Sequence, residues 1–172
     1  IPYKFTSSWI LSSIPMFLFL GFISYHTQLT RGMFNAARIW LAAVPGGLAI
    51  ASIFGSAGFA AVSGSSIACS AAMGRIAIPE MMKHRYHPEL ATGTVAVAGT
   101  IGAMIPPSII LILYGVIAQI SITDLFLGGV VAGLLTAVGY TLVVLVRVWI
   151  NPALAPERDP GVPLAEKLLA LR

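Results

Sequence analysis

The segment Val44–Ser66, VPGGLAIASIFGSAGFAAVSGSS, decides the fold of this chain, because an uncharged apolar run ends there in a short polar break, Ser63–Ser66. A second uncharged stretch, residues 90–123, is interrupted near its centre by Ile105-Pro106-Pro107-Ser108. A membrane offers no water to the backbone groups that a broken helix frees, so protein or a bound solute must satisfy them. Two breaks in one short chain therefore predict a path for a solute or an ion.

The composition indicates an all-α membrane protein that lies in a lipid bilayer. Of 172 residues, 58% are hydrophobic and 9% are charged, and the mean hydropathy is +0.92, far from the balance of a soluble domain. The net charge of +4 does not indicate a nucleic-acid partner, since the ten Lys and Arg residues lie between apolar runs, where they act as topology signals. The single cysteine, Cys69, excludes a disulfide framework within the chain.

Hydropathy, prolines and charge predict an order of segments, which also includes a half-depth hairpin. Arg75 follows Ser66 by nine residues, roughly 13 Å of helix and close to half of a ~30 Å hydrocarbon core, so a tip at mid-membrane places Arg75 at the interface. The predicted segments are a transmembrane helix at 1–28, an amphipathic interfacial helix at 29–45, a re-entrant hairpin at 46–83, a broken transmembrane helix at 90–120, a transmembrane helix at 121–149 and a cytoplasmic linker at 150–172.

The amphipathic segment 29–45 has two interpretations: a surface linker, which the sequence favours, or a lever that joins two moving bodies. With this order of segments, most of the positive charge falls on one side, which we expect to be cytoplasmic. The residues concerned are Arg31, Arg38, Arg75, Lys83, Arg85, Arg147 and Arg158.

The break at the two prolines has a definite electrostatic consequence. Neither proline carries an N–H, so the carbonyls of Gly102 and Ala103 lose their helical donors. Two half-helices that meet there present a carboxyl end, which suits a cation, and an amino end near Ser108, which suits an anion. The alternative is a simple proline kink.

The last span is expected to begin with a cap and to pack through small residues. Ser121 and Asp124 form an S-x-x-D pattern that can cap the amino end of the helix. Gly129 and Gly133 form a G-x-x-x-G pair, for which close helix packing is the ordinary role.

Three ordered motifs resemble one family, the large membrane (permease) subunit of tripartite ATP-independent periplasmic (TRAP) transporters. They are VPGGLAIASIFGSAGFAAVSGSS at 44–66, MGRIAIPEMMKH at 73–84 and TGTVAVAGTIGAMIPPSIILILYGVIAQISITDLFLGG at 92–129. The resemblance covers about Ile14 to Leu145. It implies two inverted repeats that work as an elevator, each with a re-entrant hairpin and a broken helix. This chain looks like one such repeat, and we expect a fragment or a truncated product.

The resemblance also implies a function and partners. It implies sodium-coupled uptake of an organic acid, such as a C4-dicarboxylate or sialic acid, across the bacterial inner membrane. The partners would be a small membrane subunit and a periplasmic solute-binding protein, and Na⁺ would be the coupling ion with no other cofactor.

Family and chemistry agree on a site made of neutral oxygens, because a hard cation takes oxygen ligands. The role that is left open for each serine is a satisfied hydroxyl that merely helps the hairpin to pack. The residues proposed for Na⁺ are Ser63, Gly64, Ser65, Thr100, Gly102 and Ala103, and those proposed for the carboxylate substrate are Ser65, Ser66, Pro107 and Ser108.

Other functions receive less support from the sequence. An intramembrane serine protease could use Ser63 or Ser65 as nucleophile, but it needs a nearby base, and His26, His84 and His87 all lie in loops. ATP-driven transport lacks a G-x-x-x-x-G-K-[ST] loop. A structural assembly subunit stays possible. We therefore predict a transporter component and not an enzyme.

Overall fold

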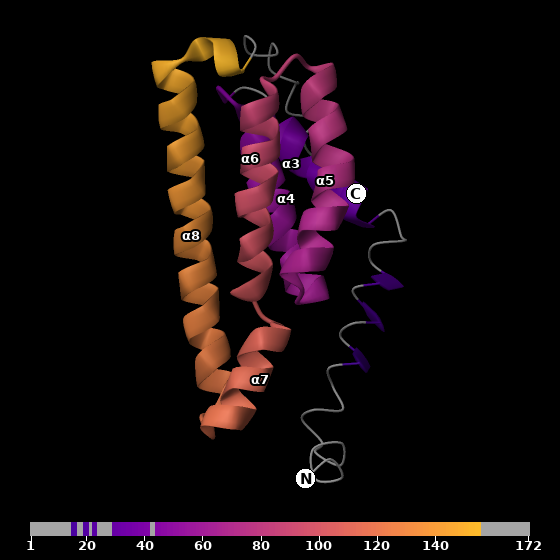
Figure 1. Ribbon diagram of the computed structural model, residues 1–172, viewed down its shortest axis with the longest axis vertical. Coiled ribbons are helices and arrows are strands. Elements are labelled where there is room, and N and C mark those ends of the chain that lie inside the picture. The colour runs from indigo at the N-terminus through magenta and orange to yellow at the C-terminus, as the bar shows by residue number, and fades with distance from the viewer. Residues whose placement is uncertain (1–14, 17–18, 21, 24–28, 42–43, 156–172) are drawn as a thin grey trace.

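The computed structural model describes residues 15–16, 19–20, 22–23, 29–41 and 44–155, and within these ranges it is helical and contains no strand (Figure 1). This confirms the all-α prediction. The predicted helix at 1–28 lies almost entirely outside the described residues, as do residues 156–172 of the predicted linker. The elements are α3 Leu29–Leu41, α4 Gly47–Ser63, α5 Ser66–Lys83, α6 Pro88–Gly99, the 3₁₀ helix η1 Thr100–Ala103, α7 Ile109–Ala118, α8 Ile122–Ile150 and the 3₁₀ helix η2 Pro152–Leu154.

Helices α4 and α5 form a tight antiparallel hairpin. Helix α4 ends at Gly64, which has φ 62° and donates its N–H to the Ala60 carbonyl. Ser65 then begins α5, because its hydroxyl accepts the Ala68 N–H at 3.3 Å. A left-handed φ is costly for any residue with a Cβ, so glycine at position 64 is what permits the two-residue reversal.

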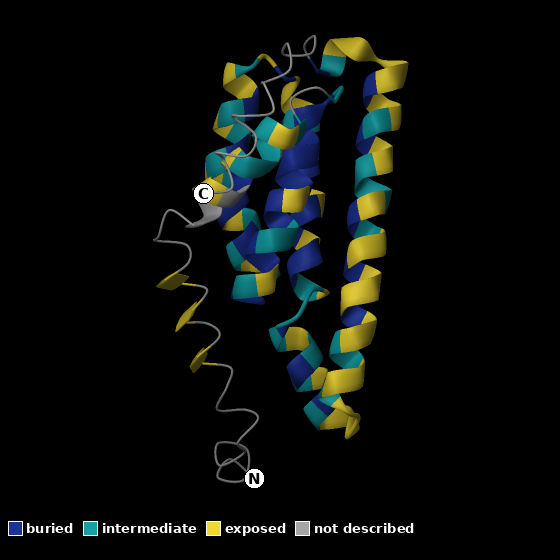
Figure 2. Ribbon diagram, turned by 180° about the vertical axis from the view of Figure 1, so that it is seen from behind, coloured by how far each residue is buried: buried dark blue, intermediate teal, exposed yellow. Residues whose placement is uncertain are grey.

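Helix α4 is the centre of the bundle. Its side chains are mostly buried, as the dark blue ribbon in the middle of Figure 2 shows, and the fully buried residues include Ile50, Ile53 and Phe59. Helices α3, α5, α6 and α8 all contact it. Small residues dominate α4, which allows the neighbouring backbones to approach closely.

The two prolines separate two helices rather than kink one. Helix α6 starts at Pro88, where a missing N–H costs nothing, and tightens into η1 over Thr100–Ala103. The chain is non-helical from Met104 to Ser108, and the Pro106–Pro107 peptide bond is cis. Helix α7 then begins with Ser108 as its cap, because the Ser108 hydroxyl accepts the Leu111 N–H at 3.4 Å.

Among the described residues, α8 alone is long and apolar enough to cross a membrane. The predicted cap is confirmed, since the Ser121 hydroxyl accepts the Asp124 N–H at 3.4 Å. The predicted packing role of the two glycines is also confirmed. A Cβ on Gly129 would lie 2.5 Å from the Met104 carbonyl oxygen, and one on Gly133 would lie 2.6 Å from the Ile105 side chain. The proline break therefore packs against α8 at Gly129 and Gly133.

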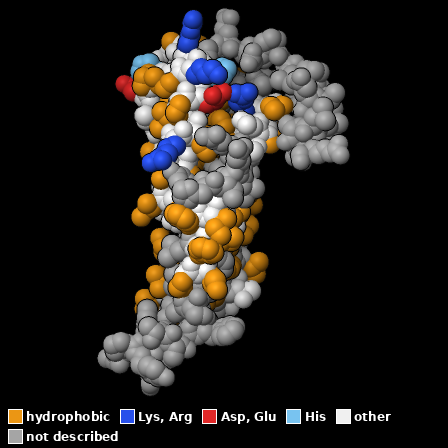
Figure 3. Space-filling model, turned by 90° about the vertical axis from the view of Figure 1, so that its right-hand side faces the viewer, with side chains coloured by type: hydrophobic (Ala, Val, Ile, Leu, Met, Phe, Trp, Pro, Cys, Tyr) orange, Lys and Arg blue, Asp and Glu red, His pale blue; other side chains and the backbone are white. Residues whose placement is uncertain are grey.

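Charged side chains gather at one end of the bundle, and hydrophobic ones cover the face below them (Figure 3). At the charged end, Arg38 of α3 forms an ion pair with Glu80 of α5, and His84 lies 3.5 Å from the same carboxylate. The Tyr86 hydroxyl accepts the Leu48 N–H at 3.3 Å, and burial raises the pKa of this phenol. These contacts fasten α3 to the end of α5, and the start of α4 to the turn that follows α5.

Candidate functional site

The hairpin tip and the proline break, which lie about forty residues apart in the sequence, are in direct contact. A Cβ on Gly64 would lie 1.9 Å from the Pro107 carbonyl oxygen, so the two backbones touch. The Ile109 N–H donates to the Gly64 carbonyl at 3.3 Å. On the other side of the tip, a Cβ on Gly102 would lie 2.9 Å from Ser66 Cα and 3.1 Å from the Ser65 carbonyl carbon. The structure thus brings the two breaks together.

Four helix ends converge at this contact. Helix α4 and η1 end there, and their carboxyl ends carry partial negative charge. Helices α5 and α7 begin there, and their amino ends carry partial positive charge. A cation next to the first pair and an anion next to the second would both be stabilised without any ionised side chain.

Two oxygen atoms at the contact lack hydrogen-bond partners within the described part of the chain. The Ser63 hydroxyl is one, and Ser63 is 1% exposed. The Gly102 carbonyl is the other: Pro106 has no N–H, and the Met104 and Ile105 N–H groups both donate to the Ile101 carbonyl. A buried oxygen without a donor is costly, and a bound cation would satisfy it.

The remaining predicted site residues divide into two groups. The Ser65 and Ser108 hydroxyls cap α5 and α7, and Ser108 also donates to the Ala103 carbonyl at 2.7 Å. The Ala103 oxygen therefore has a donor that the sequence did not reveal. Ser66 and Pro107 contribute backbone to the contact.

Thr100 is the predicted residue whose side chain is engaged elsewhere. Its hydroxyl donates to the Val97 carbonyl at 2.7 Å and lies 3.1 Å from the Tyr140 hydroxyl of α8. Because the Thr100 proton is already used, Tyr140 is the donor in that second contact. Sequence reasoning missed Tyr140, and only its polar character inside a long apolar helix marked it.

The groups that the described residues bring to the contact are hydroxyls, main-chain carbonyls and helix ends. Within the described ranges, no three His, Cys, Asp or Glu side chains are grouped so that they could hold a metal ion. The Ser63 hydroxyl has no hydrogen bond, and the Ser65 hydroxyl accepts from a backbone N–H, so neither is paired with a base in the described residues. The arrangement can bind ions through neutral groups and dipoles.

Comparison with known sequences identifies related proteins. Residues 3–160 match the family described as "Tripartite ATP-independent periplasmic transporter, DctM component". The chain is 46% identical over 134 residues to the isethionate TRAP transporter permease protein DctMQ of Oleidesulfovibrio alaskensis, which covers 77% of this chain and 21% of that protein. It is 36% identical over 170 residues to the C4-dicarboxylate TRAP transporter large permease protein DctM of Pseudomonas aeruginosa, which covers 99% of this chain and 39% of that protein.

A third relative has a different substrate in its name. The sialic acid TRAP transporter large permease protein SiaM of Vibrio cholerae is 33% identical over 131 residues, which cover 76% of this chain and 31% of that protein. The chain therefore spans between 21% and 39% of the length of these three relatives. The three names differ in the substrate and agree in the class of protein, a transporter permease.

Proposed function

Because the chain belongs to the family of the DctM component of tripartite ATP-independent periplasmic transporters, we propose that it provides the ion-binding part of a sodium-coupled carrier for an organic acid. The carrier would act in the bacterial inner membrane together with a small membrane subunit and a periplasmic solute-binding protein. The observation that carries this proposal is the contact between the hairpin tip and the proline break, with the unpartnered Ser63 hydroxyl beside it.

Support for Na⁺ comes from the kind of oxygen at the contact. The Ser63 hydroxyl and the Gly102 carbonyl are uncharged hard ligands, and the carboxyl ends of α4 and η1 add partial negative charge. In this proposal the backbone of Gly64 and Ser65 closes the site from the hairpin side. Thr100 would contribute through its backbone, because its hydroxyl contacts Val97 and Tyr140.

Support for an anionic substrate comes from the amino ends of α5 and α7. The capping serines Ser65 and Ser108 stand at these two ends. A carboxylate placed near Ser66 and Pro107 would face both positive ends, and a Na⁺ ion beside it would stabilise it further. The names of the relatives suggest C4-dicarboxylates, sialic acid or isethionate as candidate anions.

Alkylation of Cys69 tests sodium binding directly. Cys69 is the only cysteine of the chain, is fully buried, and lies one helical turn beyond the tip. In the purified chain in lipid nanodiscs, a thiol reagent should react more slowly in Na⁺ than in K⁺ at equal ionic strength. Ligand binding that raises stability by RT ln(1 + [L]/Kd) predicts a slowing of roughly tenfold at a Na⁺ concentration ten times Kd.

A pair of serine variants separates sodium binding from general hairpin packing. Ser63→Ala should abolish the difference between Na⁺ and K⁺. Ser52→Ala is the matched control, because Ser52 is equally buried in α4 but its hydroxyl donates to the Leu48 carbonyl at 2.8 Å, so it should keep the difference. Equal alkylation rates in Na⁺ and K⁺ for the unmodified chain would contradict the proposal.

A further inference from the structure

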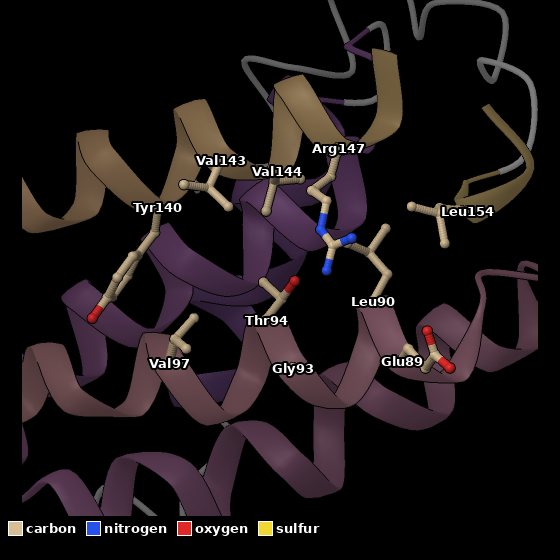
Figure 4. Close-up of a pocket in the computed structure, with 10 residues that line it drawn as sticks. All are labelled: Glu89, Leu90, Gly93, Thr94, Val97, Tyr140, Val143, Val144, Arg147 and Leu154. Atoms are coloured by element: carbon tan, nitrogen blue, oxygen red, sulfur yellow. The ribbon is translucent and has the colours of Figure 1, made fainter. Parts of the chain in front are cut away.

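A groove of about 340 Å³ lies between α6 and α8 near the charged end of the bundle, away from the proposed ion site (Figure 4). Leu90 and Val97 of α6 and Val143 and Val144 of α8 form apolar walls. Its volume falls in the range of pockets that bind small molecules. Gly133, which contacts the proline break, precedes Arg147 in this groove by fourteen residues, so the two sites are roughly 21 Å apart along α8.

Two polar side chains enter this groove without partners. The Arg147 guanidinium points between the two helices (Figure 4), and no acidic side chain of the described residues lies within ion-pair distance of it. Thr94 is 4% exposed, and its hydroxyl makes no hydrogen bond within the described ranges. Thr92, on the same helix, instead donates to the carbonyl four residues earlier, as helical threonines commonly do.

The depth of these groups indicates what could occupy the groove. Arg147 lies in the last turn of α8, two residues before Trp149, which is 85% exposed. Arg and Trp side chains at a helix end mark the level of the lipid headgroups. The apolar walls extend from there to Tyr140, seven residues or roughly 10 Å toward the centre of the helix. A cationic mouth above an apolar slot fits an anionic head with an attached hydrocarbon chain.

We propose that this groove binds one membrane phospholipid. Its phosphate would accept hydrogen bonds from the Arg147 guanidinium and the Thr94 hydroxyl, and one acyl chain would lie along Leu90, Val97 and Val144. A free phosphate would leave the apolar walls uncovered, whereas an acyl chain would cover them.

A second charged side chain at the mouth of the groove indicates which type of lipid headgroup would bind. Glu89 lines the same groove and its side chain is 85% exposed. A carboxylate at this position repels an additional negative charge and attracts an ammonium group. The proposal therefore specifies a phospholipid with an amine in its headgroup, such as phosphatidylethanolamine, in preference to phosphatidylglycerol.

Native mass spectrometry of the purified, delipidated chain tests this inference. Titration with phosphatidylethanolamine should give one tightly retained lipid, and glycerol phosphate at the same concentration should not displace it. Arg147→Gln should weaken retention about tenfold or more, since hydrogen bonds to charged groups contribute about 1.5–3 kcal/mol. Thr94→Val, which keeps the shape of the side chain, should weaken it by a smaller factor.

A control variant and a headgroup variant complete the experiment. Lys83→Gln removes an exposed cation at the same end of the bundle but outside the groove, so it should leave retention unchanged. Glu89→Gln should remove the preference for phosphatidylethanolamine over phosphatidylglycerol. The inference fails if no lipid is retained, if Arg147→Gln and Lys83→Gln behave alike while circular dichroism shows intact helices, or if glycerol phosphate competes.

Discussion

At the scale of single residues, three serines that look equivalent in the sequence have different roles in the structure. Ser65 and Ser108 each cap a helix with the side-chain oxygen, whereas the Ser63 hydroxyl is buried and has no hydrogen-bond partner among the residues that the structure describes. The sequence predicts all three as ligands because each is a small hydroxyl beside a break. The backbone around each serine decides whether its hydroxyl is available to bind an ion, and residue type alone cannot reveal that.

Gly64 is the residue on which the contact between the two breaks depends most directly. It combines φ 62° with an approach that would place a Cβ 1.9 Å from the Pro107 oxygen. Gly64→Ala should therefore destabilise the chain by at least about 2 kcal/mol, from left-handed strain plus the displaced backbone. Thermal unfolding in detergent measures this.

The matched control for that substitution is Gly74→Ala in the middle of α5. A Cβ at position 74 would meet nothing within 4 Å, and alanine favours helix over glycine by about 1 kcal/mol. This variant should be as stable as the unmodified chain or more stable. Equal stability of the two variants would show that the tip and the break are not in contact.

At the scale of elements, the packing of α8 against the break depends on two glycines one turn apart. Gly129 and Gly133 let the Met104 carbonyl and the Ile105 side chain approach the helix axis, while Gly128, beside them, faces open space. Gly129 and Gly133 thus have a packing role that Gly128 lacks, and a pair of alanine variants can test this difference.

Gly129→Ala should weaken the packing of α8 against the proline break, and Gly128→Ala should not weaken it. We expect Gly129→Ala to cost about 1–3 kcal/mol, as insertion of a methyl group into a packed contact commonly does. Gly128→Ala adds helix propensity without a collision. Unfolding in detergent measures the stability of both variants. An equal loss of stability in the two would contradict the packing of Gly129 against the proline break.

Elements were more predictable from the sequence than the contacts between them. Glycine, proline and the capping serines are local signals, and so the positions of the hairpin turn, the proline break and the start of α8 could be read directly. The contact of Thr100 with Tyr140 joins residues forty positions apart in the sequence, and no local pattern encodes it. The partnered Ala103 carbonyl escaped prediction for a related reason, because its donor lies beyond two prolines.

At the scale of the whole molecule, the chain is strongly polarised along its length. Lys83, Arg85 and Arg147 lie at the end where α5 and α8 finish, and the turn between α7 and α8 carries no Lys or Arg. Much of the remaining surface of α8 is apolar and exposed, which suits lipid. The positive-inside rule therefore predicts that the charged end faces the cytoplasm.

Cysteine accessibility in intact cells tests this orientation. In a Cys69→Ser background, Thr123→Cys at the start of α8 should react with a membrane-impermeant thiol reagent from outside. Lys83→Cys at the end of α5 should react only after the cells are permeabilised. Both positions are exposed, so burial does not explain a difference. The reverse pattern would invert the assigned topology.

The interlocked glycines have a mechanical consequence. A hairpin that swung out alone to release an ion would have to break the hydrogen bond from Ile109 to Gly64 and separate Gly102 from Ser66, which leaves main-chain groups bare inside the lipid. In the proposed carrier we therefore expect the tip, the break and the helices around them to move together, because such a movement keeps all those contacts. Access to the ion would then be controlled at the outer surface of this unit, and not by opening of the tip.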